Sequence, residues 1–217
     1  MLTRAAFLAA LAALACRDPS APQPPIEAAP PRAPTLSPRE YDQRGDEHLK
    51  AGRFAAAIAD FDRFLEAHPE LEPQHWRRGI AYYYAGEYQA GVEQFEQHRT
   101  VNPADVENAA WHFLCRARAT DAKAAREALL PVGHDSRVPM TKIYALFAGR
   151  ATADEVVRAA VDEPGALFYA HLYVGLHHEA LGAAEAARRH IQLAATEFGQ
   201  PHYMGDVARV HATLLTK

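Results

Sequence analysis

Residues 78–88 read RGIAYYYAGEY, and residues 44–54 read RGDEHLKAGRF. The two stretches lie 34 positions apart, and small, aromatic and proline residues in and after them keep this offset. The matching pairs are Gly45 with Gly79, Gly52 with Gly86, Phe54 with Tyr88, Ala57 with Gly91, Phe61 with Phe95, and Pro69 with Pro103. A fixed period of this length indicates stacked helical hairpins, because each repeat can bury its apolar face only against its neighbours.

The residue types within the period fit a helical hairpin. Small residues let two helices cross closely, whereas glycine and proline end helices. This pattern resembles the tetratricopeptide repeat, which implies antiparallel helix pairs, a right-handed superhelix and a concave surface lined by the first helix of each pair. No segment alternates with period two, so we predict no strands. The predicted fold class is an all-α solenoid of about ten to eleven helices.

The period also predicts where the repeats lie. Two clear repeats are expected at 38–71 and 72–105, and a third at 168–201, where the spacing returns at Gly175, Gly182, Ala187, Ile191 and Ala194. Between them, residues 106–162 are expected to form two weaker helical pairs, 106–120 with 121–130 and 138–149 with 152–161. A last helix at 203–215 is expected to cover the exposed end of the stack.

The N-terminus has the pattern of an export signal. Arg4 precedes an apolar run that is too short to span a bilayer as a permanent helix, so residues 1–15 are predicted to be a signal peptide. The run ends in Ala13-Leu14-Ala15-Cys16, which resembles a bacterial lipobox with a departure at Leu14. Cys16 is therefore predicted to carry the lipid, and cleavage as an ordinary secretory signal is the alternative. Residues 16–37 are then a proline-rich linker, which predicts a semi-extended tether.

Charge and cysteine content limit the possible partners. The formal net charge of -4 gives no concentrated positive surface, so nucleic acid is not an expected partner. The chain has two cysteines, Cys16 and Cys115. They are not expected to pair, and Cys115 is interpreted as a small apolar core residue.

Candidate catalytic and metal-binding residues form no recognisable motif. His134-Asp135-Ser136 are consecutive, whereas a catalytic triad is usually assembled from separate segments, so we interpret them as part of a polar loop. No two histidines have the helical spacing of three or four that favours metal binding on one face. Binding across helices by His171, His178 and His190 remains an alternative. We expect no enzyme activity, no metal and no cofactor.

The repeat register predicts which residues line the concave groove. In the second repeat they are Trp76, Ile80, Tyr83 and Tyr84, and in the first they include Asp42, Asp46 and Lys50. Aromatic side chains with a polar tip are favoured anchors for a bound peptide or helix, so these residues are the candidate partner-binding groove. The alternative is that the tyrosines fill the hairpin core and a neighbouring interface.

Together, the lipobox, the stretch 78–88, Asn102-Pro103, Trp111 and the late hairpin at 173–182 resemble the new-lipoprotein-I type of bacterial lipoprotein. The resemblance implies a homodimeric adaptor anchored in the outer membrane and facing the periplasm. It also implies protein partners in the cell envelope, such as peptidoglycan hydrolases or a processing protease. A structural lipoprotein of a secretion or pilus assembly is an alternative, and a metal-binding or catalytic lipoprotein is a less favoured one.

Overall fold

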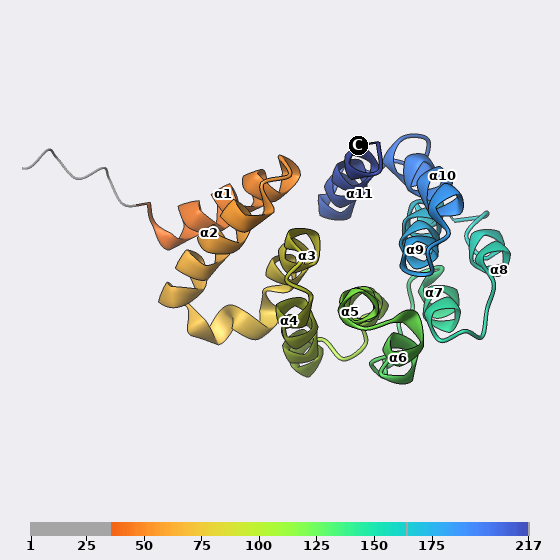
Figure 1. The fold of residues 1–217 in the computed structure, drawn as a ribbon, viewed down its shortest axis with the longest axis horizontal. Coiled ribbons are helices and arrows are strands. Elements are labelled where there is room, and N and C mark those ends of the chain that lie inside the picture. Colours follow the sequence, from red (N-terminus) through yellow and green to blue (C-terminus); the bar gives the residue numbers. More distant parts are fainter. Residues whose placement is uncertain (1–35, 164, 217) are drawn as a thin grey trace, which may run out of the picture. The chain divides into compact units, whose positions relative to one another are not determined.

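The computed structural model describes residues 36–163 and 165–216. The predicted signal peptide, Cys16 and nearly all of the proline-rich linker lie outside the described residues. Within the described residues the chain is all-helical, with eleven α-helices and one 3₁₀ helix (Figure 1). In chain order they are α1 Pro38–Lys50, α2 Phe54–Ala67, η1 Pro69–Gln74, α3 Trp76–Ala85, α4 Tyr88–Val101, α5 Val106–Ala119, α6 Ala122–Glu127, α7 Met140–Phe147, α8 Ala153–Arg158, α9 Ala166–Ala180, α10 Ala184–Ala195 and α11 Tyr203–Leu214.

Neighbouring helices pack in antiparallel pairs, which confirms the predicted tetratricopeptide-like α-solenoid. The repeated glycines explain the close approach within each pair. A Cβ atom built on Gly79 would lie 2.7 Å from Phe95 Cζ, and one on Gly45 would lie 2.5 Å from Phe61 Cε1. The aromatic ring of the second helix therefore occupies the space that a side chain on the first helix would need.

Local signals fix the ends of several helices. Ser37 caps α1 through a reciprocal capping box with Glu40, and Thr152 and Glu155 do the same for α8. Gly86 ends α3 with φ of +82°, a left-handed conformation that glycine adopts without steric cost. One element is not expected from the sequence: η1, a 3₁₀ helix with Pro73 inside it, joins the first repeat to the second.

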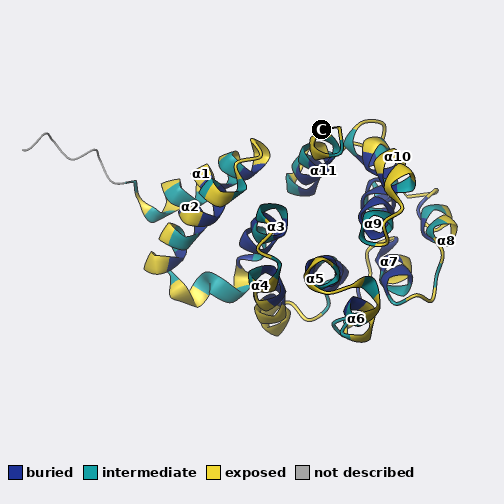
Figure 2. Cartoon of the chain, viewed as in Figure 1, coloured by how far each residue is buried: buried dark blue, intermediate teal, exposed yellow. Residues whose placement is uncertain are grey.

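The core runs continuously through the described helices. Buried residues lie on the helix faces that meet neighbouring helices, and exposed residues lie on the outer faces (Figure 2). The largest fully buried side chains include Trp111, Tyr173, Phe61, Phe95, Phe113, Phe147 and Phe168. Cys115 is free and fully buried, as the sequence predicts, and burial raises the pKa of its thiol.

Helix α11 is the main departure from expectation. Instead of only covering the end of the stack beyond α10, it turns back and also contacts α1, α3 and α9 (Figure 1). Asp206 of α11 forms an ion pair with Lys50 of α1, with 3.2 Å between Oδ2 and Nζ. We call the side of the stack on which α11 lies, lined by α1, α3, α5 and α9, the inner face.

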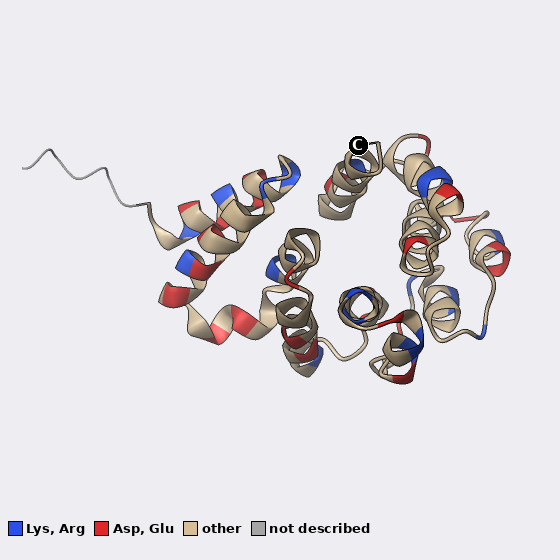
Figure 3. Cartoon of the chain, viewed as in Figure 1, with Lys and Arg blue, Asp and Glu red and all other residues tan. Residues whose placement is uncertain are grey.

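Lys and Arg are interspersed with Asp and Glu along the described helices (Figure 3). None of the helices in the described part is both long and apolar enough to cross a membrane.

Candidate functional site

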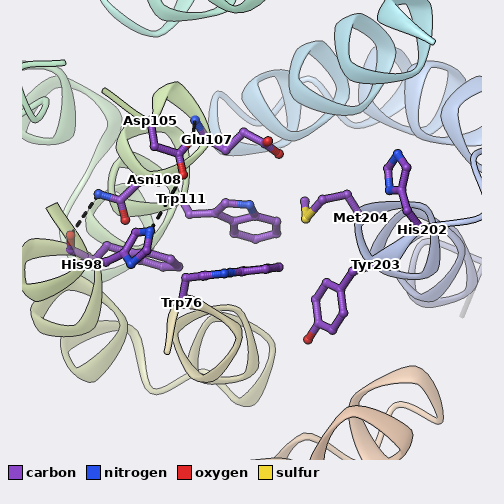
Figure 4. A pocket seen from close by; sticks show the side chains of 10 residues that line it. Trp76, His98, Asp105, Glu107, Asn108, Trp111, His202, Tyr203 and Met204 are labelled. Atoms are coloured by element: carbon purple, nitrogen blue, oxygen red, sulfur yellow. Dashed lines mark hydrogen bonds and ion pairs between the residues drawn. The ribbon is translucent and has the colours of Figure 1, made fainter. Parts of the chain in front are cut away.

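A cavity of about 290 Å³ opens on the inner face, between the second repeat, α5 and the start of α11 (Figure 4). Its lining is aromatic on several sides and polar at one end. The lining residues are Trp76, Phe95, His98, Asp105, Glu107, Asn108, Trp111, His202, Tyr203 and Met204. Both tryptophans of the chain belong to this set. The volume is at the small end of the range of ligand pockets, so it suits one side chain better than a cofactor.

Aromatic contacts hold α11 against the second repeat. The ring of Trp76 meets that of Tyr203 edge-on, with centroids 5.0 Å apart. Tyr84 Oη lies 3.0 Å from Nδ1 of His211, and His211 is only 2% exposed. Trp111 packs edge-on against Tyr83 at 5.4 Å. These contacts join α3, α5 and α11 into one aromatic cluster beside the cavity.

The predicted groove residues of the second repeat fall into two groups in the structure: one lines the cavity, and the others are packed against neighbouring helices. Trp76 lines the cavity and is partly buried, so it can meet a bound group. Ile80 and Tyr83 are buried, at 0% and 6% exposure, and Tyr84 is partly buried beneath α11. Burial raises the pKa of Tyr84 well above its ordinary value. Ile80 and Tyr83 thus pack inside the protein, and Tyr84 packs against α11, which is where the alternative interpretation placed the tyrosines.

The predicted residues of the first repeat hold helices together. Arg77 donates two hydrogen bonds to Asp42, both 2.8 Å, and one to Asp46, so its guanidinium joins α3 to α1. His75 Nε2 lies 2.9 Å from Asp42 Oδ1 and adds to this junction. The pKa of Asp42 is lowered, because the hydrogen bonds from His75 and Arg77 outweigh the effect of its partial burial. Lys50 is exposed and pairs with Asp206 of α11.

A charged network borders the polar end of the cavity. Arg137 Nη1 donates to Glu107 at 2.6 Å, and its Nη2 donates to Asp105 at 3.0 Å and to Asp135 at 2.7 Å. Glu107 also accepts a hydrogen bond of 2.6 Å from the Tyr173 hydroxyl. Burial raises the pKa of Glu107, and the neighbouring Asp105 adds to the rise. The Arg137 guanidinium therefore donates hydrogen bonds to three carboxylates.

Sequence reasoning missed most of the cavity. Trp111 stands 35 positions after Trp76, close to the repeat period, so the period could have placed both on equivalent first helices. His98, Asp105 and Asn108 come from the end of α4, the following turn and the start of α5. Met204 and Tyr203 come from α11. No sequence signal joins Tyr203 and Met204 to the other lining residues, because that contact depends on the return of α11.

The three histidines considered as a metal site lie near one another on α9 and α10. His171 Nδ1 is 2.8 Å from His190 Nδ1, and the His178 ring lies 5.6 Å from that of His190. The short Nδ1–Nδ1 distance is that of a hydrogen bond, with one ring donating and the other accepting. Burial lowers the pKa of His190 to about 4, with His171 adding to the shift. Over the described ranges, no group of three His, Cys, Asp or Glu side chains has the geometry to hold a metal ion.

The sequence His134-Asp135-Ser136 forms no triad in the structure. Asp135 accepts hydrogen bonds from Arg137 and from the amide of Val106, and these lower its pKa despite partial burial. None of the hydrogen bonds found in the described residues joins His134, Asp135 and Ser136 to one another. Asp135 thus fixes the loop after α6 to the start of α5.

No family model matches the chain. A stretch of 76 residues is 33% identical to Protein SGT1 homolog from Bos taurus. The match covers 35% of this chain and 22% of that protein, so the chain spans about a fifth of the length of this relative. Together with the paired helices, the similarity is compatible with a tetratricopeptide-repeat protein and suggests a general role in protein interaction.

Proposed function

We propose that this chain is a scaffold that binds other proteins through its inner face. The observation that carries the proposal is the cavity beside α11, whose walls include both tryptophans, Tyr203 and Met204. Tryptophan and tyrosine are enriched among the residues that dominate protein interfaces, because each buries a large area and keeps a polar tip. A cavity of this size fits an anchoring side chain of a partner.

The proposal also includes a cellular setting. The signal-like residues 1–15 and the lipobox ending at Cys16 support a lipid-anchored protein of the bacterial cell envelope, in the outer membrane and facing the periplasm. The resemblance to new-lipoprotein-I-type lipoproteins supports an adaptor, without enzyme activity of its own, for peptidoglycan hydrolases or a protease. A homodimer is part of the same proposal.

A quantitative partner capture tests the binding function. The tagged full chain is cross-linked in its own cells, and co-purified proteins are quantified by mass spectrometry for wild type, Trp76→Ala and Val161→Ala. Val161 is 59% exposed and lies outside the cavity, so its variant controls for loss of an apolar side chain. We expect Trp76→Ala to lose a set of partners that Val161→Ala keeps, with circular dichroism showing folded protein. Equal partner sets in the two variants would contradict binding at the cavity.

The anchor has a separate test. The mass of the mature N-terminal peptide is measured for wild type and for Cys16→Ser. We expect the wild-type peptide to begin at Cys16 and carry acyl chains. An unmodified N-terminus that begins at another residue would identify an ordinary secretory signal.

A further inference from the structure

The polar end of the cavity presents acceptors that need donors. His98 Nδ1 lies 2.9 Å from the carbonyl oxygen of Pro73, and a carbonyl can only accept, so Nδ1 must carry the proton. In the neutral imidazole, Nε2 is then an acceptor. Its nearest carboxylate oxygen is Asp105 Oδ2, 3.9 Å away, which is too long for a hydrogen bond. Two acceptors therefore face each other across a gap.

Asn108 adds a third acceptor with a fixed orientation. Its Nδ2 donates to the carbonyl of Phe95 at 3.0 Å, so the amide oxygen must be the other atom of the group. Asn108 is 4% exposed, and its Oδ1 has no hydrogen-bond partner among the described residues. Figure 4 shows Asn108 and His98 at the same end of the cavity, with Asp105 near them. An unpaired buried acceptor costs free energy that a bound donor recovers.

Two properties of the site restrict which hydrogen-bond donor can bind there. They are the number of acceptors and the negative charge of the neighbouring side chains. Among the described residues, Asp105 Oδ2 accepts only a 3.3 Å bond from Asn102, so it can accept another. A water molecule offers two hydrogens, whereas an ammonium offers three. The neighbouring network has three carboxylates, those of Asp105, Glu107 and Asp135, and one guanidinium, so a positive ligand is favoured.

The other walls suit the rest of a lysine side chain. Trp76, Phe95 and Trp111 offer apolar surface for the four methylene groups, which lysine commonly lays along apolar residues. Aromatic faces also attract an ammonium. We propose that the cavity binds the primary ammonium group of a lysine side chain presented by a partner protein, at His98, Asp105 and Asn108. This deepens the proposed function, on which it rests, by specifying the anchor.

Intrinsic fluorescence of the full chain tests the proposal, because its two tryptophans both line the cavity. The probe is Nα-acetyl-lysine amide. The controls are its Nε-acetylated form and Nα-acetyl-norleucine amide, which has the same stem without the ammonium. We expect a saturable change with the lysine probe and binding weaker by about tenfold or more for both controls, as expected for loss of a charge-assisted contact.

A charge-removing variant links the signal to the acceptors. Asp105 caps α5 by accepting from the amide of Glu107, and asparagine caps helices equally well, so Asp105→Asn should stay folded. We expect Asp105→Asn to weaken the lysine probe by about tenfold. Glu93→Gln removes the same charge from an exposed position of α4 and should leave the binding constant unchanged.

Three results would overturn the proposal. If the norleucine probe binds as tightly as the lysine probe, the cavity recognises the apolar stem and not the ammonium group. Equal effects of Asp105→Asn and Glu93→Gln would place the ammonium elsewhere, and displacement of the probe by micromolar Zn²⁺ would identify a metal site. The proposed function is judged separately by partner capture. A partner lost in Trp76→Ala but retained after its lysines are acetylated would uphold the scaffold and reject the lysine anchor.

Discussion

Substituting Gly79 by alanine tests whether close helix crossing holds the repeats together. On an exposed helix this change stabilises by about 1 kcal/mol, because alanine has the higher helix propensity. Here the new Cβ would lie 2.7, 2.9 and 3.0 Å from three ring carbons of Phe95, which is 1% exposed and cannot swing into solvent. Overpacking a core typically costs about 1–3 kcal/mol. We therefore expect Gly79→Ala to lower the free energy of unfolding by about 1–2 kcal/mol.

Urea unfolding followed by circular dichroism measures this change. The matched variants are Phe95→Leu and the double variant Gly79→Ala/Phe95→Leu. Phe95→Leu alone destabilises by leaving a cavity, but it also makes room for the new methyl group. The double variant should therefore be more stable than the sum of the single effects predicts. A stabilised Gly79→Ala, or strictly additive effects, would refute the close crossing.

Three further predictions concern other contacts. Tyr84→Phe removes the 3.0 Å contact with buried His211, so it should lower the free energy of unfolding in urea by about 1–2 kcal/mol. Tyr82→Phe is the control and should have a smaller effect, because the Tyr82 hydroxyl has no hydrogen bond in the described part. Gly86→Ala places alanine at φ +82° with open space around it, so a loss of about 1 kcal/mol in the same assay should come from backbone strain alone. Burial lowers the pKa of His190 and His177 to about 4 from an ordinary 6.5, so the unfolded chain binds more protons between these values. The melting temperature should accordingly fall as pH drops from about 6.5 to 4, and a melting temperature constant over this range would argue against buried neutral histidines.

The period of 34 residues was sufficient to predict the fold class. Glycine and its facing aromatic residue, such as Gly45 with Phe61, mark the same contact in successive repeats, and this contact is local in the sequence. The position of α11 could not be predicted in this way. Its apolar spacing indicates a helix with one buried face, but its contact between His211 and Tyr84 joins residues 127 positions apart.

The candidate site shows the same limit. Trp76 was predicted on the inner face and lines the cavity, because its place follows from the repeat register. Asp42 and Asp46 were assigned to the groove from the same register, but both accept hydrogen bonds from Arg77 and so join α1 to α3. The repeat register predicts which way a side chain points, but it does not predict which side chain from another helix will contact it. The acceptors of the polar end come from α4, α5 and the turn between them and are close in the sequence, but the repeat register alone does not show that their side chains meet the two tryptophans and α11 at one cavity.

We propose that a partner binds the inner face beside the two tryptophans. The most direct test follows the indole N–H signals of Trp76 and Trp111 by NMR while a captured partner is added to ¹⁵N-labelled protein. We expect both indole signals to shift, together with amides at the start of α11, while amides of the outer helices α2 and α10, which do not line the inner face, stay in place. Shifts confined to the outer helices, with both indoles unchanged, would contradict it.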